Sequence, residues 1–199
     1  MNRKTMIAIV ALVATLLPAV AVADVMVQGF VNGNSQAVPD AFYVQPGSNY
    51  MQAHSAAGGF TWMSKSVSES EILGNITLGF MTNETIYEVN VLDVNFSSGA
   101  SGDFNITVTV PSGGVSGTVA FPEDTAMWVS NEPFTLSYSG IHFASGSTTY
   151  EFNLASPGTT SEVFDNVNHS THLYIAFVVG AGPADESYSF LVTMSLLSS

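Results

Sequence analysis

The side chains that could do chemistry in this chain are few and widely separated. His169 and His172 are three residues apart, a spacing that suits a metal ion on a helix. This pair, however, precedes a strand-like segment, and successive strand residues face opposite ways, so we expect the two imidazoles to diverge. The other histidines, His54 and His142, lie far away in the sequence. We therefore predict no metal site and no cofactor.

Carboxylates occur as two pairs beside turn-forming residues, Glu123-Asp124 and Asp185-Glu186. Calcium takes carboxylate and backbone oxygens from such loops, but neither stretch has the alternating Asp/Asn ligands with a distal Glu. We expect both pairs to be solvated turn residues. The sequence also has no Gly-x-Ser-x-Gly motif and no cysteine, and none of its 16 acidic residues stands out for glycosidic chemistry. We predict that the protein has no catalytic residues and is not an enzyme.

Five segments match the Asn-x-Ser/Thr acceptor pattern of N-glycosylation. Chance alone gives a slightly smaller number in a chain so rich in Ser and Thr. Asn95 and Asn105 lie on the polar sides of predicted strands, where a glycan could be carried. The candidate glycosylation sites are Asn75, Asn83, Asn95, Asn105 and Asn168.

The charge of the chain is strongly one-sided, with 16 acidic residues against three Lys and Arg and a formal net charge of −13. Nucleic acids and anionic membranes bind clustered basic residues, so the composition argues against both as partners. Because there is no cysteine, packing or assembly must replace the disulfides that stabilise many exported proteins. Lys65 could form an isopeptide cross-link with an Asn near a carboxylate, and its spacing neither favours nor forbids this.

The N-terminus has the three parts of a secretory signal. Arg3 and Lys4 are basic, residues 6–17 are apolar, and Ala21-Val22-Ala23 supplies the small residues at a cleavage site. The apolar run is shorter than the roughly 20 residues that span a bilayer. An uncleaved assembly helix of the type IV pilin kind is less favoured, because no small residue follows the basic pair. We predict a signal peptide over residues 1–23 and a mature protein outside the cell or at its surface.

Period-2 alternation of apolar and polar residues dominates after residue 84 and indicates strands separated by turn formers. The segment 173–179 is apolar on both faces, which predicts a central strand. A short helix is predicted only at 64–71. The pattern favours an all-β fold, an antiparallel and jelly-roll-like β-sandwich forming a single domain over residues 36–199. The predicted strands are 41–45, 72–80, 86–96, 104–110, 115–121, 134–143, 149–154, 173–179 and 188–196.

A short apolar strand and a flexible link, residues 24–35, precede this domain. The strand can pair within its own sandwich, or it can complete the sheet of a neighbouring copy by main-chain hydrogen bonds. A head-to-tail contact of the second kind does not close on itself and propagates a filament. The C-terminal strand could serve as the donor instead. The candidate interface residues are Val25, Met26, Val27, Phe30 and Val31.

The layout of the chain resembles that of known surface-fibre proteins. The resemblance rests on the signal peptide leading into an apolar strand, on the Asn/Thr-rich segment 104–110 before Pro111, and on segments 173–179 and 188–190. The mature chain resembles the archaeal bundling-pilus and thread subunits and the bacterial biofilm-fibre proteins of the TasA/camelysin type. The resemblance implies a jelly-roll-like sandwich that polymerises by donating an N-terminal strand. The near absence of Lys departs from the bacterial members and fits archaeal surface proteins better.

We therefore expect a structural subunit of an extracellular filament or pilus, with copies of itself as partner and with covalent glycans on its surface. The alternative is a secreted surface binding module, either an adhesin or a carbohydrate binder, or a surface-layer component. A secreted hydrolase is less favoured. It would gather acidic and aromatic side chains in a cleft around Trp62 or Trp128, and we expect both of these residues to be packed in the core.

Overall fold

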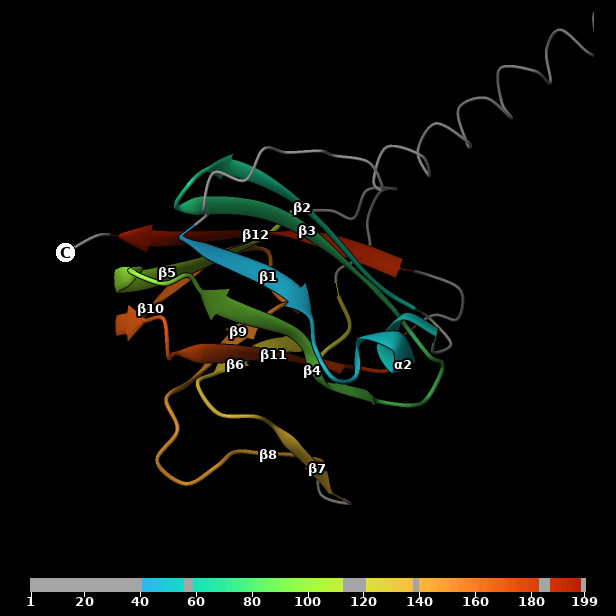
Figure 1. Ribbon diagram of the computed structural model, residues 1–199. Helices are drawn as coiled ribbons and strands as arrows, with labels where there is room; N and C mark the ends of the chain where they lie inside the picture. Colours follow the sequence, from blue (N-terminus) through green and yellow to red (C-terminus); the bar gives the residue numbers. More distant parts are fainter. Residues whose placement is uncertain (1–40, 56–58, 113–120, 138–139, 183–186, 198–199) are drawn as a thin grey trace, which may run out of the picture. The chain divides into compact units, whose positions relative to one another are not determined.

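The computed structural model describes residues 41–55, 59–112, 121–137, 140–182 and 187–197 (Figure 1). The predicted signal peptide, the candidate donor strand and link, the acidic pair Asp185-Glu186 and most of the predicted strand 115–121 lie outside the described residues. Within these described ranges, no helix has the length and hydrophobicity needed to cross a membrane.

Two five-stranded antiparallel sheets pack face to face, as the sequence predicts. Sheet A contains, in spatial order, β1 (Phe42–Pro46), β4 (Ile86–Phe96), β11 (His172–Val179), β6 (Ala126–Ser130) and β9 (Thr149–Asn153). Sheet B contains β10 (Gly158–Asn168), β5 (Ser101–Val110), β12 (Ser187–Leu197), β3 (Glu71–Gly79) and β2 (Phe60–Ser68). A small hairpin is formed by β7 (Thr135–Ser137) and β8 (Gly140–His142), and a short helix, α2, spans Tyr50–Ser55.

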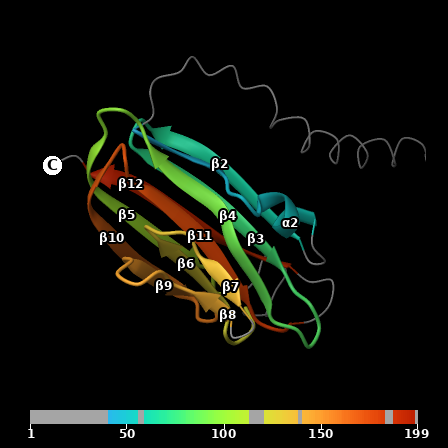
Figure 2. The same cartoon turned by 60° about the horizontal axis from the view of Figure 1, so that its bottom comes forward.

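The pairing of the strands is that of a jelly roll. The chain from β3 to β6 is matched in reverse by the chain from β9 to β12, since β3 pairs with β12, β4 with β11, β5 with β10, and β6 with β9. Successive strands of this double-layered hairpin alternate between the two sheets, which is the jelly-roll order. β2 and β1 each add one strand on the same side, next to β3 and β4, while β10 and β9 lie on the other side (Figure 2).

The core between the sheets follows from the alternation in the sequence. On β5, Phe104, Ile106 and Val108 are buried, and the intervening polar residues face outward. Phe177 on β11 lies 5.4 Å from Phe60 on β2, measured between ring centroids, and so links the two layers. Burying side chains of this size contributes about 2 to 3 kcal/mol each. β11 is the central strand of sheet A, which confirms the prediction drawn from its two apolar faces.

Two predicted elements are wrong. The predicted strand 134–143 is instead the β7–β8 hairpin, in which Thr135 pairs with His142, and Gly140, with a φ of 113°, interrupts the extended chain. Residues 64–71 were expected to form a helix, but Ser64 pairs with Gly74 and Lys65 with Leu73, as part of β2 beside β3. Extended pairing satisfies the backbone groups of β3 that would otherwise form an open edge, which outweighs the weak local helix preference of a Ser-rich stretch. The helix that does form, α2, lies in a segment for which the sequence predicted no regular structure.

A bulge in β4 shapes the part of the fold that carries the candidate sites. The pairing with β11 shifts register between Ile175 and Phe177, and Asn90 of β4 takes the left-handed conformation with a φ of 51°.

 Bulges bend a strand and re-aim its side chains. Here the bulge separates the half of β4 that pairs with β1 from the half that does not.

The chain after β1 takes over the edge of β4 beyond this bulge. β1 pairs only with residues 92–96, and the Gly47 N–H then donates to the Val91 carbonyl at 2.8 Å. A Cβ at Gly47 would lie 2.2 Å from the Asn90 carbonyl oxygen, so only glycine allows this approach. The Asn49 amide donates to the Val89 carbonyl at 2.8 Å and brings α2 beside the first half of β4 (Figure 1).

Candidate binding face

The outward-pointing aromatic side chains gather on one side of the sandwich. Four come from strands of sheet A, and Phe143 comes from the segment after β8. Tyr43, Tyr87 and Phe143 are 47%, 41% and 43% exposed, and the other two are half-buried. We call this surface the aromatic face. It consists of Tyr43, Tyr87, Trp128, Phe143 and Tyr174.

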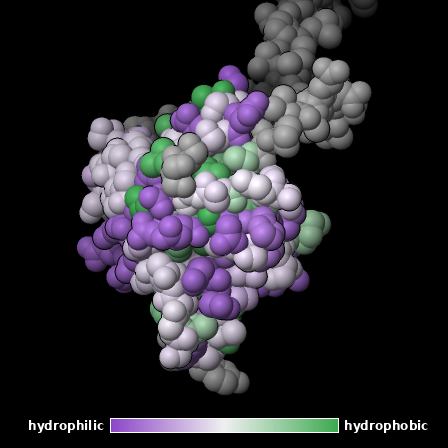
Figure 3. Space-filling view, turned by 60° about the vertical axis from the view of Figure 1, so that its left-hand side comes forward, coloured by the Kyte–Doolittle hydropathy of each residue, from purple (hydrophilic) through white to green (hydrophobic). Residues whose placement is uncertain are grey.

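The β7–β8 hairpin forms a wall along this face. The Asn90 side chain holds the hairpin, because its Nδ2 donates to the Phe134 carbonyl at 2.8 Å and its Oδ1 accepts from the Phe134 N–H at 2.9 Å. Phe143 packs between Phe134 and Trp128, with ring centroids 5.8 Å and 4.9 Å away. The hairpin stands out from the body of the sandwich at the bottom of Figure 1 and Figure 3.

Polar side chains lie in register between the aromatic ones. Tyr43, Asn95 and His172 form one row across β1, β4 and β11, and Asp93 and Tyr174 belong to the next row. His172 Nδ1 hydrogen-bonds Asn95 Oδ1 at 2.5 Å. Asn95 Nδ2 and Asp93 Oδ1 are buried and have no hydrogen-bond partner among the described residues. Leaving such a group unpaired costs about 1 to 3 kcal/mol.

Burial and nearby negative charges both favour the protonated form of the phenol of Tyr174. Burial, and then the negative charges of Asp93 and Glu132, raise the pKa of Tyr174. Burial also raises the pKa of Asp93, while the charge of His172 lowers it. Tyr174 therefore keeps its hydroxyl hydrogen at neutral pH and can donate a hydrogen bond to a ligand.

The outer face of sheet B has a different chemistry. Its hydroxyl groups pair with one another across strands: Thr77 with Ser189 at 2.6 Å, and Thr107 with Ser161 at 2.8 Å. No aromatic side chain lies on this outer face in the described part of the chain. Leu191 and other exposed apolar residues share this face with the hydroxyls. This face offers a ligand few unsatisfied groups.

The five candidate glycosylation sites lie in different surroundings. Asn83 is exposed in the turn between β3 and β4, with a φ of 62°. Asn75 and Asn105 are half-buried on the outer face of sheet B, and Asn168 lies at the end of β10. Asn95 is only 6% exposed and is the least accessible of the five. Glycosylation at all of them stays a prediction.

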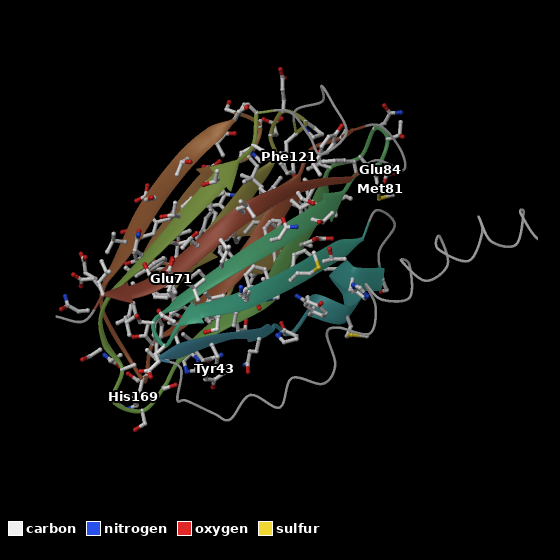
Figure 4. All side chains as sticks on the ribbon, turned by 90° about the horizontal axis from the view of Figure 1, so that it is seen from above. Tyr43, Glu71, Met81, Glu84, Phe121 and His169 are labelled. Atoms are coloured by element: carbon white, nitrogen blue, oxygen red, sulfur yellow. The ribbon has the colours of Figure 1, made fainter. Side chains whose placement is uncertain are left out.

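The histidines and acidic residues singled out in the sequence do not converge. His169 lies in the exposed turn after β10 and His172 at the start of β11, and Figure 4 shows His169 at this turn. Glu123 and Asp124 are exposed in a turn. Among the residues that the structure describes, no group of three or more His, Cys, Asp or Glu could hold a metal ion.

The two tryptophans occupy different environments. Trp62 is half-buried against Gly74, where an added Cβ would lie 2.0 Å from the indole ring. Trp128 belongs to the aromatic face and is also half-buried, so the prediction that it packs in the core is wrong. The two therefore lie in separate sheets and do not form one cleft.

Figure 4 shows Tyr43 on β1 and Met81, Glu84 and Phe121 at the opposite end of the sandwich.

A separate pocket of about 380 Å³ lies between α2 and the first half of β4. Glu88 lines it, is 9% exposed, and has one oxygen, Oε2, that is buried without a hydrogen-bond partner. Burial raises the pKa of Glu88 to about 7. Sequence reasoning missed this residue. The sequence signal that could have found it is its place in the alternation, since Glu88 falls on the same side of the strand pattern as Ile86 and Leu92.

Comparisons with known proteins give no family. No protein-family model matches the chain, and no curated protein matches it. The fold is similar to TmCBM61 in complex with beta-1,4-galactotriose, with a TM-score of 0.34 and 10% identity over 77% of this chain and 95% of that one.

Two further solved structures are similar at the same level. Peruvianin-I, a cysteine peptidase from Thevetia peruviana latex, has a TM-score of 0.29 and 11% identity over 83% of this chain and 78% of its own. A structure described as "CBM4 structure and function" has a TM-score of 0.27 and 11% identity over 83% of this chain and 88% of that one. At these TM-scores the likenesses carry no argument about function.

Proposed function

We propose that this protein is a surface binding module that holds a neutral carbohydrate on the aromatic face. The observation that carries the proposal is the unequal distribution of side chains between the two outer faces. Aromatic rings and unpaired polar groups lie together on sheet A, whereas the hydroxyls of sheet B satisfy one another. The alternative function predicted from the sequence is thus favoured over the filament.

The chemistry of a sugar matches this lining. The C–H faces of a pyranose ring are apolar and pack flat on aromatic rings, which bury a large area at small entropic cost. Sugar hydroxyls both donate and accept, so they can pair with the phenol of Tyr174 and the imidazole of His172. Ligand sites usually combine an apolar surface with a small number of precisely placed polar groups.

The net charge selects among carbohydrates. The chain carries a formal charge of −13, and its field repels polyanions such as uronic-acid polymers. A neutral glycan is not repelled by this field. The predicted export of the chain would bring this face into contact with surface or environmental polysaccharides.

Affinity electrophoresis in gels that contain soluble neutral polysaccharides tests the proposal. We expect a polysaccharide among glucans, galactans and mannans to retard the protein, and Tyr43→Ala and Tyr174→Ala to lose at least about tenfold in affinity, equal to about 1.4 kcal/mol. Leu191→Ala is the matched control, because it removes an exposed apolar side chain from the opposite face. The proposal fails if no neutral polysaccharide retards the protein, or if Leu191→Ala weakens binding as much as the tyrosine variants.

A second function, the filament subunit, is favoured by one observation, the open edge of β2. β2 has nine residues and no partner beyond it in sheet B among the described strands. Its second half, from Met63 on, has only exposed side chains, and Val67 is 55% exposed. An exposed, partly apolar edge can accept a strand from another copy. Lys65 lies in this edge, however, and charged edge residues oppose such pairing.

A further inference from the structure

We propose that the pocket beside Glu88 binds a small organic cation, an ammonium group on an apolar body. The pocket is lined by four consecutive residues of β4, 86–89, and so lies at the edge of this strand beside α2. Glu88 itself is on the core side, because it pairs directly with the buried Phe177 of β11. Tyr87 of the aromatic face also lines the pocket, so the two sites adjoin at this residue, and the bulge at Asn90 separates Glu88 from Asp93 and Asn95.

The carboxylate lacks a partner that a ligand could supply. Glu88 Oε2 is buried with no donor within hydrogen-bond distance among the described residues, and none of the residues that line the pocket is basic. A carboxylate accepts hydrogen bonds but donates none. An ammonium group has three donors and no acceptor, so it complements this oxygen in both charge and hydrogen bonding.

The remaining polar lining is also suited to a donor. Asn49 uses its Nδ2 on the Val89 carbonyl, which leaves its Oδ1 as an acceptor without a partner among the described residues. Gln52 supplies a second side-chain amide at the exposed rim. Neither group carries a charge that would compete with Glu88 for the cation.

The apolar walls of the pocket determine which carbon skeleton the ligand can have. Ile86, Ala53 and Leu136 line the pocket with apolar surface, and Leu136 is 53% exposed on β7. A volume of about 380 Å³ is within the range of small-molecule sites. The acidic protein as a whole also attracts cations, which raises their local concentration. An alkyl or aryl ammonium therefore fits better than an inorganic cation, which would leave these walls in water.

Titration with matched probes tests the proposal. Propylammonium and 2-phenylethylammonium are compared with the neutral isostere 2-phenylethanol at about pH 8, where the carboxylate is ionised. Nuclear magnetic resonance follows the amides of residues 86–89 and the carboxyl carbon of Glu88. We expect 2-phenylethylammonium to bind with a dissociation constant on the order of 1 mM or lower, and the alcohol at least about tenfold more weakly.

Variants assign the binding to this pocket. Glu88→Gln should abolish the preference for the ammonium over the alcohol, and Glu84→Gln, an exposed glutamate in the β3–β4 turn, should leave it unchanged. Leu136→Ala should weaken 2-phenylethylammonium more than propylammonium. The comparison of ammonium with alcohol on the unmodified protein stands even if Glu88→Gln does not fold. The proposal is overturned if alcohol and ammonium bind equally, if neither perturbs residues 86–89, or if a folded Glu88→Gln retains the preference.

Discussion

Glu88 is the residue at which burial and charge conflict most. Moving an ionised carboxylate out of water without a partner is unfavourable, so the group resists ionisation until about pH 7. In an ordinary core this position would hold an aliphatic residue, as Ile86 and Leu92 do on the same side of β4. Keeping a carboxyl there lowers stability at neutral pH, which is the kind of cost expected at a functional site.

The pH dependence of stability follows from the direction of this shift. The folded pKa of Glu88, about 7, is above its unfolded value near 4.5, so the folded protein binds the proton more tightly. The stabilisation is complete below about pH 4.5 and is lost as the pH rises to about 7. We expect the unfolding free energy to fall over this interval by up to about 3 kcal/mol from Glu88 alone. Urea denaturation at a series of pH values measures it.

Glu88→Gln isolates this contribution. Asp93 also has a raised pKa and acts in the same direction, so the total slope does not identify the residue. The difference between the parent protein and Glu88→Gln should shift in favour of the variant as the pH rises from 5 to 8, by roughly the amount above. A difference that stays constant over this range would contradict a buried, unpaired Glu88.

At the scale of elements, the bulge in β4 links both candidate sites. Asn90 adopts a φ of 51°, which asparagine tolerates better than most residues. Its side chain takes both backbone hydrogen-bonding groups of Phe134, as a neighbouring strand would. One residue thereby re-aims β4 toward the Glu88 pocket and anchors the wall of the aromatic face.

Substitution of Asn90 separates these two roles. Asn90→Gly keeps the left-handed backbone but loses both hydrogen bonds to Phe134, and we expect a destabilisation of about 1 to 3 kcal/mol. Asn90→Ala loses the same bonds and adds backbone strain, so it should be about 1 kcal/mol less stable than the glycine variant. Chemical denaturation gives both values. Equal stability of the alanine and glycine variants would show that the backbone conformation carries no strain.

The sequence predicted most strands because burial on one face imposes a period of two. The predicted strand 86–96 coincides with β4, and 173–179 with all but the first residue of β11. β6 and β10 were not predicted. β6 is short and apolar without alternation, and β10 is an edge strand whose first half is exposed, so neither has the pattern that burial on one face produces.

The candidate sites could be predicted only in part for a related reason. The polar rows of the aromatic face depend on register between β1, β4 and β11, which lie far apart in the chain. Alternation shows that Tyr43 or Tyr174 points outward but does not show what lies beside it. The Glu88 pocket depends in addition on α2, whose six residues carry no periodic signal. Local patterns are insufficient where a site is made by non-local pairing.

At the scale of the whole molecule, the jelly roll allows filament assembly and carbohydrate binding at the same time. The eight matched strands pair among themselves, and β1 and β2 extend both sheets on one side. A strand added to β2 would extend sheet B, whereas the aromatic face belongs to sheet A. Strand donation would therefore leave the proposed carbohydrate face open, and a filament could present many copies of it.

Deletion of residues 24–31 distinguishes the two functions. If the segment from Val25 to Val31 pairs with the β2 edge of another copy, the deletion should abolish filaments in electron micrographs and leave a folded monomer. Carbohydrate binding per subunit should be unchanged, because the aromatic face contains none of the deleted residues. Binding to an insoluble polysaccharide would weaken, since linked sites gain affinity through effective concentration.

Lys65→Val provides the complementary variant, because it removes the charge that opposes pairing at the β2 edge. If β2 is the acceptor, this substitution should promote filaments in the full mature chain and have no effect in the deleted one. Light scattering and electron microscopy of both proteins measure the outcome. Filaments that persist after the deletion would assign the donor to another segment, and the absence of filaments from every variant would leave the monomeric binding module as the function of the chain.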